Sequence, residues 1–198
     1  AQGAAEGTLV VAEEQTGGKG RLGRQWCSAK HKGSFFSFIL YPPFAPTEAN
    51  IVTLISAVAL ATAINNVTGV VAGIKWPNDL LLNGKKICGI LTELSAEMER
   101  INYLVVGVGI NVNQEESDFP EEVRPVATSL KAQTGIRTSR VKLVQVFLRE
   151  FDTGTCQVER NGCFPELPGA NSNAKQFLGG VGRGYRQRRG TSPAPAGR

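Results

Sequence analysis

The sequence predicts an α/β (α+β) domain, and three observations support this class. Short apolar segments that are typical of buried strands recur along the chain. Two of them flank an Asn83-Gly84 pair, which is typical of a hairpin turn because both turn residues need a positive φ. Two other segments have the composition and apolar spacing of helices. At 198 residues the chain is long enough for one domain with a sizeable core.

The predicted strands are separated by clear turn and loop signals. The Asn-Gly pair joins the fourth strand to the fifth, and the polar residues 97–100 indicate a second hairpin before the last strand. Residues 14–26 contain too much glycine for the interior of a helix or strand, which predicts a loop. We expect strands at residues 7–13, 34–40, 70–76, 79–82, 85–94 and 103–112, the first of them short and buried.

The two predicted helices differ in character. Residues 47–64, with Thr47 as the N-cap, are apolar nearly all round, which predicts a deeply packed helix. The apolar run at residues 51–64 is too short to span a bilayer, so we expect no membrane segment. Residues 139–151 carry apolar side chains at helical spacing, with Ser139 as the cap.

The chain changes character after Phe151, where Gly, Pro, Asn and Arg become dominant. This change predicts a folded domain over residues 1–151 and a degraded or disordered segment over residues 152–198. No charged-then-apolar secretory signal opens the sequence, so the cytoplasm is the expected compartment.

Charge and cysteine content argue against two classes of function. Five of the 22 basic residues are arginines within residues 182–198, and the remaining seventeen match the 17 acidic residues. A neutral body does not support a nucleic-acid-binding surface over the whole domain. The four cysteines form no C-x-x-C pair and the single histidine, His31, has no cysteine near it. We therefore expect reduced, mostly packed cysteines and no zinc site.

Residues 17–26, GGKGRLGRQW, combine the features of an anion-binding loop. Glycines let the backbone approach a ligand and present its N–H groups, while Lys19, Arg21 and Arg24 supply cations for phosphate or carboxylate oxygens. Trp26 offers a flat face for stacking. The pattern is not a Walker A loop, and a solvated basic loop or a nucleic-acid contact is the alternative.

A second motif, KWPND at residues 75–79, ends a predicted strand with polar groups and is followed by KKICGIL at residues 85–91. Lys86 begins the return strand and can reach the same ligand, and Gly89 allows the backbone to approach it closely. The alternative is that Lys85 and Lys86 are ordinary exposed hairpin lysines.

A third motif, GVGIN at residues 107–111, lies inside a predicted strand. It lacks the third glycine of the dinucleotide fingerprint and does not precede a helix, which argues against a Rossmann site. Glycines in a strand suit a ligand that lies flat against it, and Asn111 can bind an amide or an adenine edge. A core strand with glycines for close packing is the alternative.

Taken in this order, the motifs resemble the biotin–protein ligase family, whose signatures are a G-R-G-R-x-G-R-x-W loop, K-W-P-N-D, K-x-x-G-I-L-x-E and G-x-G-I-N. The match covers residues 9–151, and Lys19 stands where the family has arginine. The resemblance implies a fold like the class II aminoacyl-tRNA synthetases, with a mixed, mostly antiparallel sheet flanked by helices. It makes residues 1–151 the catalytic domain of a chain truncated at both ends, because the family's earlier Ser-Thr-Asn segment would precede residue 1 and the alternating strands of the small β-barrel-like domain that ends many members are not found after residue 151.

The resemblance also implies a two-step reaction that uses ATP, biotin and Mg²⁺. The carboxylate of biotin attacks the α-phosphate of ATP and gives biotinyl-5′-adenylate and pyrophosphate, while Mg²⁺ bridges the phosphates without identified protein ligands. A lysine of the biotin carboxyl carrier domain of a carboxylase then attacks the mixed anhydride and releases AMP. A homodimer is a further expectation, whereas no DNA-binding module and no membrane contact are expected.

Site residues follow from the same resemblance. Two anions must be brought together, so Lys86 and Arg21 are expected beside the carboxylate and the α-phosphate. Asp79 either positions or deprotonates the acceptor lysine, or it caps the end of its strand. The expected biotin-binding residues are Gln15, Gly18, Lys19, Arg21, Lys86 and Gly89, and the expected ATP-binding residues are Arg24, Trp26, Lys75, Asn78 and Asn111.

Two other functions remain open on the sequence. A lipoate or octanoyl ligase shares the fold and the acyl-adenylate chemistry, although residues 19–26 and 75–79 favour biotin. A non-catalytic nucleic-acid-binding module would use the basic loop and the arginine-rich tail. The neutral body and the placement of the motifs on buried strands argue against this second alternative.

Overall fold

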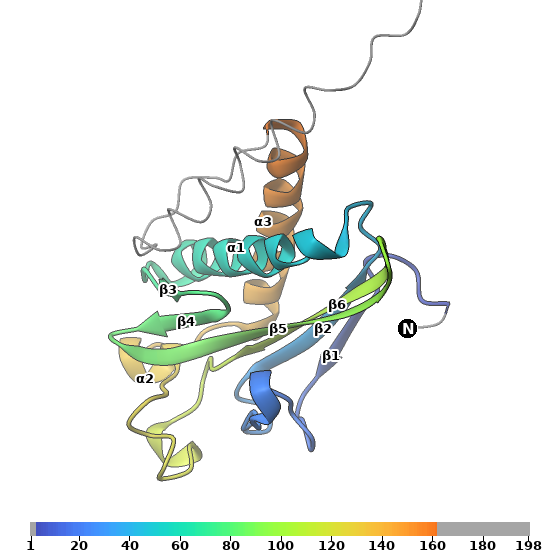
Figure 1. Cartoon of the computed structure of the whole chain (residues 1–198). Helices are drawn as coiled ribbons and strands as arrows, with labels where there is room; N and C mark the ends of the chain where they lie inside the picture. Colours follow the sequence, from blue (N-terminus) through green and yellow to red (C-terminus); the bar gives the residue numbers. More distant parts are fainter. Residues whose placement is uncertain (1–2, 162–198) are drawn as a thin grey trace, which may run out of the picture.

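The structure is a computed structural model that describes the backbone of residues 3–161 and the side chains of residues 3–155 (Figure 1). Its centre is a six-stranded antiparallel sheet in the order β1-β2-β6-β5-β4-β3. Helices α1 and α3 pack against each other and cover one face of this sheet. The predicted α+β class with a mostly antiparallel sheet is therefore confirmed. The strands are β1 (Leu9–Ala12), β2 (Ser34–Leu40), β3 (Gly73–Lys75), β4 (Asp79–Leu82), β5 (Lys85–Glu97) and β6 (Arg100–Ile110).

Both predicted hairpins are present. Asn83 and Gly84 have φ values of 50° and 79°, as a tight turn between β4 and β5 requires. The second hairpin pairs β5 with β6 over nearly their whole length and turns at Met98, whose φ is 37°. The long β5–β6 hairpin is the central structure on which the site is built.

Strand β1 departs from the prediction of a buried strand. It lies at the edge of the sheet and pairs only with β2. Val10 and Val11 are 64% and 58% exposed. The apolar sequence indicated the strand correctly, but periodicity does not distinguish a central strand from an edge strand that no helix covers.

Helix α1 (Asn50–Thr68) is the core helix of the domain. It begins three residues later than predicted, because Pro46–Glu48 form a 3-10 turn in which the Glu48 carboxylate accepts a hydrogen bond from the N–H of Ala45. With that turn the helical segment is long and apolar enough to cross a membrane, contrary to the prediction that it is too short. Most of it is buried inside the protein, and the Thr53 hydroxyl bonds to that of Thr92 on β5. Burial against the sheet accounts for its apolar character.

Helix α3 (Arg140–Asn161) packs across α1 and the sheet. Its predicted cap is present, since Ser139 Oγ accepts a hydrogen bond from the N–H of Lys142 at 3.3 Å. Phe147 and Phe151 of α3 form an aromatic cluster with Phe36 and Phe38 of β2. The helix runs past the domain boundary that we predicted at residue 151, and the predicted disordered segment from residue 162 onward lies outside the described residues.

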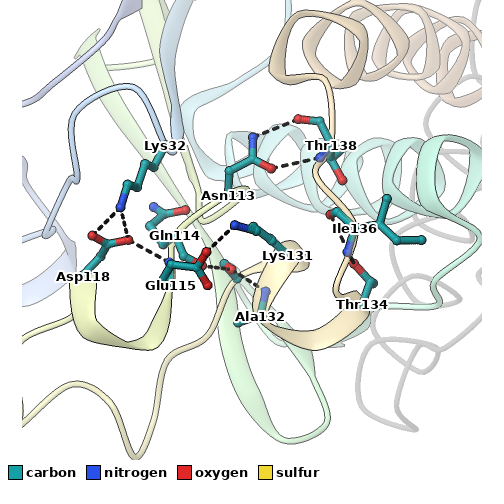
Figure 2. A network of polar contacts seen from close by, with 11 residues as sticks. Lys32, Asn113, Gln114, Glu115, Asp118, Lys131, Ala132, Thr134, Ile136 and Thr138 are labelled. Atoms are coloured by element: carbon teal, nitrogen blue, oxygen red, sulfur yellow. Dashed lines mark hydrogen bonds and ion pairs between the residues drawn. The ribbon is translucent and has the colours of Figure 1, made fainter.

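A polar network fixes the segment that follows β6 (Figure 2). The side chain of Asn113 exchanges two hydrogen bonds of 2.9 Å with the backbone of Thr138. Lys32 binds the carboxylate of Asp118 at 2.6 Å, and Lys131 forms an ion pair with Glu115. The short helix α2 (Leu130–Thr134), which the sequence reading missed, begins where Ser129 Oγ accepts from the N–H of Ala132.

Candidate active site

The loop before β2 lies on the face of the sheet opposite α1 (Figure 1). On that face, two glycines of β5 and β6 lie against the ring of Trp26. Gly89 and Gly109 are register partners on the two strands. A Cβ atom at Gly109 would lie 2.7 Å from the Trp26 ring, and one at Gly89 would lie 2.9 Å from it. The two glycines are required here because an aromatic ring lies directly on the backbone.

Between this face and the loop lies a cavity of about 210 Å³. Its wall combines the three motifs that the sequence placed far apart, and most of its polar side chains come from the loop and from β5. The residues that line it are Gln15, Gly17, Lys19, Gly20, Arg21, Trp26, Phe36, Ser37, Asn78, Lys86, Gly89, Ile90, Leu91, Glu93, Gly107, Val108 and Gly109.

Lys86 is the most strongly positioned cation of the cavity. Its Nζ lies 2.7 Å from Asp79 Oδ1 and 5.4 Å from the centre of the Trp26 ring. Its backbone is held as well, because the Lys86 N–H donates to the carbonyl of Val126 and the Lys86 carbonyl accepts from Thr128. These bonds fix the start of β5 and aim the ammonium group into the cavity.

Lys85 behaves differently from its neighbour. Its Nζ donates to the carbonyl of Arg124 at 3.0 Å, and it does not line the cavity. Neighbouring residues on a strand point to opposite faces, so the hairpin separates the two lysines as the sequence predicted. Lys86 is therefore more than a generic exposed lysine.

The glycine-rich loop is held at a few points only. The N–H of Trp26 donates to the carbonyl of Gly18, and the N–H of Gly20 donates to Arg24. Arg21 crosses the cavity, with its Nη1 3.1 Å from Asn78 Oδ1. Asn78 is itself fixed, since its side chain and backbone each form a hydrogen bond with the backbone of Ile90. The loop and the KWPND motif are thus joined through one charge-assisted hydrogen bond.

The remaining loop residues lie around the mouth of the cavity. Gln15 and Lys19 line it, and Gly18 is buried beside Gln15 Oε1 and the backbone of Trp26. Arg24 lines an adjoining, more open space of about 580 Å³ that the loop also bounds. The expected biotin-binding and ATP-binding loop residues are therefore neighbours in space.

Two of the expected ATP-binding residues lie elsewhere. Asn111 is only 3% exposed, donates to the carbonyl of Thr128 at 3.0 Å and accepts from Gln114 Nε2 at 3.2 Å. Its amide already has partners inside the protein, and it does not line the cavity. Lys75 is exposed at the end of β3 and does not line the cavity either. The geometry gives no support to a nucleotide contact for these two side chains.

Some lining residues were not recognised as site residues from the sequence. Ser37, Leu91, Glu93 and Gly107 all face the cavity. The signal that identifies them is the two-residue periodicity of strands, because Leu91 and Glu93 follow Gly89 on the same face of β5. The motifs at residues 85–91 and 107–111 include Leu91 and Gly107, and the K-x-x-G-I-L-x-E stretch ends at Glu93, but none of these three was predicted as a site residue.

Burial and nearby charges determine the state of two groups around the site: a buried cysteine thiol, and a carboxylate that lies just before the glycine-rich loop. Burial raises the pKa of the Cys88 thiol far above its usual range, although the nearby Lys86 charge opposes this. Cys88 is therefore a packed thiol, as predicted, whereas the free Cys27 is exposed.

Glu13 accepts hydrogen bonds from Arg140 and His31, and these lower the pKa of its carboxyl group. No described residues form a group of three or more His, Cys, Asp or Glu side chains that could hold a metal ion.

The comparison with known families agrees with the geometry of this site. The model of the biotin/lipoate A/B protein ligase family matches residues 2–111, and the chain belongs to this family. It is 45% identical over 149 residues to the bifunctional ligase/repressor BirA of Bacillus subtilis (strain 168), a match that covers 75% of this chain and 46% of that protein. It is 33% identical over 156 residues to the biotin–[acetyl-CoA-carboxylase] ligase of Mycobacterium tuberculosis, with 77% and 55% covered. The chain spans about half the length of these curated relatives.

Solved structures give the same result for the fold. The chain is similar to the biotin protein ligase of Aquifex aeolicus in complex with biotin and ATP, with a TM-score of 0.68 and 31% identity over 93% of this chain and 68% of that chain. The ligase of Leishmania major in complex with biotinyl-5-AMP has a TM-score of 0.63 at 21% identity and covers 98% of this chain and 77% of that chain. The fold expected from the motifs is confirmed.

Proposed function

We propose that this chain carries the catalytic site of a biotin–protein ligase, which activates biotin with ATP as biotinyl-5′-adenylate and transfers it to a lysine of a biotin carboxyl carrier domain. The observation that carries the proposal is the position of Lys86. Its ammonium group faces a cavity that is lined by glycines of β5 and β6 and by Trp26 and Arg21. The relatives named as biotin ligases, and the related structure that binds both biotin and ATP, support this choice of substrates.

The charges of the cavity suit the first step. Biotin's carboxylate and the α-phosphate of ATP repel each other, and a cation between them stabilises their approach and the charge that develops in the transition state. Lys86 supplies that cation from the strand wall, and Arg21 supplies a second from the loop. Gln15, Gly18, Lys19 and Gly89 would surround biotin in this arrangement.

The nucleotide would occupy the more open space beside the loop, which Arg24 and Trp26 line. Trp26 also lines the cavity, together with Asn78. We infer that Mg²⁺ enters with the phosphates of ATP, since the described residues offer no acidic cluster of their own for it. Asp79 contacts Lys86 at 2.7 Å, so we infer that it orients the ammonium group of Lys86, a role that differs from the two expected from the sequence.

Biotin-dependent exchange of radiolabelled pyrophosphate into ATP tests the proposal. The chain should catalyse this exchange with biotin but not with lipoate or octanoate. Exchange that depends on lipoate in place of biotin would instead assign the lipoate branch of the family. Strong salt-dependent binding to nucleic acid without any exchange would favour the non-catalytic alternative. A homodimer and a cytoplasmic location remain predictions, which sedimentation and cell fractionation would test.

A further inference from the structure

The connection between β1 and β2 contains the whole glycine-rich loop, and one side chain from outside it reaches both of its ends. The connection runs from Glu13, directly after β1, to Gly33, directly before β2. Arg140, the first residue of α3, donates from Nη1 to Glu13 Oε2 at 2.8 Å and to the carbonyl of Gly33 at 3.1 Å. Its Nη2 lies 3.4 Å from Glu13 Oε1, so the guanidinium group contacts both carboxylate oxygens.

We call residues 13–15 and 28–33 the stem of the loop, because local hydrogen bonds join these two segments. The Ser28 hydroxyl accepts from the N–H of Gln15 at 2.8 Å and donates to its carbonyl at 3.0 Å. The N–H of His31 donates to the carbonyl of Glu13, and His31 Nδ1 lies 2.9 Å from Glu13 Oε2. These bonds are exposed, so each contributes little by itself because water competes for the same groups.

Arg140, in contrast, belongs to the rigid part of the domain. Thr138, two residues before it, is bound through its backbone to the side chain of Asn113 (Figure 2). Its helix is anchored in the core by the fully buried Phe147. The Arg140 side chain is 28% exposed, against 52% for Glu13, and of the groups around Glu13 it lowers the pKa of the carboxyl most. The stem is therefore attached to the core through this one guanidinium group.

We propose that Arg140 is a positioning residue for adenylate formation and retention: it holds both ends of residues 13–33, so that the loop closes over the cavity at a smaller cost in entropy. The loop carries Gln15, Lys19 and Arg21 to the cavity wall, whereas Arg140 does not line the cavity. Fixing both ends of a flexible segment removes conformations that the open loop would otherwise sample. This inference rests on the proposed function.

The test uses Arg140→Met, Glu13→Ala and the double variant, with Arg149→Met as the matched control. Arg149 lies on the same helix, is exposed, and its side chain forms no hydrogen bond or ion pair with a described residue. Three quantities are measured: the release rate of biotinyl-adenylate, the maximal rate and the KM for biotin in pyrophosphate exchange, and hydrogen exchange of the stem amides without ligand. Urea unfolding checks that each variant is folded.

In Arg140→Met, adenylate release should become roughly 10-fold faster and the KM for biotin should rise by a similar factor. The maximal exchange rate should change less than about 2-fold, because Lys86 is held by the strand and not by the loop. Adding Glu13→Ala to Arg140→Met should have little further effect, since both substitutions remove the same contact. Arg149→Met should match the wild type.

The ligand-free protein gives an independent readout of the same contact. The amides of Gln15 and His31, which close the stem, should exchange roughly 10-fold faster in Arg140→Met than in wild type. The amides of residues 104–110 on β6 should exchange at the wild-type rate. A role in the stability of the whole fold would instead accelerate exchange in both places.

Unchanged adenylate release and unchanged stem exchange in Arg140→Met would overturn the positioning role, as would additive losses in the double variant. A lower maximal rate at an unchanged KM, or faster exchange that extends over β6, would show that Arg140 supports only the stability of the fold and would also overturn it. In all these cases the wild type still exchanges pyrophosphate in a biotin-dependent manner. A wild-type chain that does not would overturn the proposed function and this inference with it, so the two failures are distinguishable.

Discussion

The cavity has a strand wall and a loop wall, and the two are built in opposite ways. Gly89 and Gly109 lie within the continuous β5–β6 hairpin, and Lys86 is fixed by backbone hydrogen bonds and by Asp79. The loop wall, residues 17–24, consists almost entirely of exposed or half-exposed residues. Leu22 at its tip is 90% exposed and has a positive φ of 58°.

This difference indicates a division of work between the two walls. A residue whose position is set by the sheet can stabilise a transition state without reorganisation, which is the property that electrostatic catalysis needs. A loop with glycines and few apolar contacts is costly to order by itself, so a bound anion must supply the free energy that orders it. We infer that the strand wall determines the rate of adenylate formation, while the loop retains the adenylate.

The largest effect is expected on the strand wall. Lys86→Ala should lower biotin-dependent pyrophosphate exchange by about 10²–10³, the usual loss for one well-placed electrostatic donor. Lys85→Ala is the matched control, because Lys85 Nζ binds the Arg124 carbonyl outside the cavity. The control should change the exchange little, and an equal loss in both folded variants would show that the hairpin acts only as a generic basic surface.

A smaller effect is expected on the loop wall. Arg21→Gly removes the hydrogen bond to Asn78 and a cation, so biotinyl-adenylate should be released roughly 10- to 100-fold faster. Adenylate formation should persist in part, and free adenylate should label lysines on a bystander protein. Leu22→Gly loosens the same loop without removing a charge and should release less. Tight retention of the adenylate by Arg21→Gly contradicts the role given to the loop.

The contact between the two walls can be tested at the glycines. Gly109→Ala places a Cβ 2.7 Å from the Trp26 ring, so the ring must move, and biotin binding should weaken by about 1–3 kcal/mol. Gly107→Ala is the comparison, since its Cβ meets Leu91 and Ser37 at 3.5 Å, an ordinary contact. Calorimetry should show the larger loss for Gly109→Ala; the reverse order would mean that the ring does not form part of the site.

The smallest effect concerns pH and lies outside the cavity. Burial raises the pKa of Asp118, but hydrogen bonds from Lys32 and the Glu115 N–H lower it more, so its folded pKa lies below the usual value of 3.8. The ion pair therefore stabilises the fold above that pH, and the stabilisation is lost as the pH falls through the folded pKa. Because Lys32 is 41% exposed, the contribution should stay below about 1 kcal/mol.

Urea unfolding of Asp118→Asn between pH 7 and pH 3 checks this. The variant should be slightly less stable than wild type at pH 7, and the difference should shrink toward pH 3. Glu116→Gln, on the neighbouring exposed residue, should show no such convergence. A stability difference that grows as the pH falls would mean that the pKa of Asp118 is raised in the folded protein, not lowered.

The sequence predicted the local structure of the cavity walls better than it predicted the burial and the bounds of the strands and helices. The Asn83-Gly84 turn and the opposite directions of Lys85 and Lys86 follow from local backbone rules, which act within a few residues. Burial is different, because it depends on which elements come to lie side by side. The edge position of β1 and the helical length of α1 could not be read from apolar composition alone.

The same limit explains the two residues that lie outside the cavity. Asn111 belongs to a motif that points to a ligand, yet its amide is used by Thr128 and Gln114 in a buried network. Thr128 lies 17 residues further along the chain, and Gln114 lies after β6 in a segment without the apolar periodicity of a helix or a strand. Glu93 was overlooked for the opposite reason: its strand and its motif were recognised, but the sequence alone does not show that the last residue of that motif lines a cavity.

Hydrogen exchange, read with and without biotin and ATP, tests the division of work between the two walls most directly. Without ligand, the amides of residues 17–24 should exchange quickly, whereas those of residues 104–110 on β6 should already be protected by the sheet. Adding both ligands should slow exchange across the loop and leave β6 nearly unchanged. Loop exchange that the ligands leave unchanged, or protection that appears only on β6, would contradict the account.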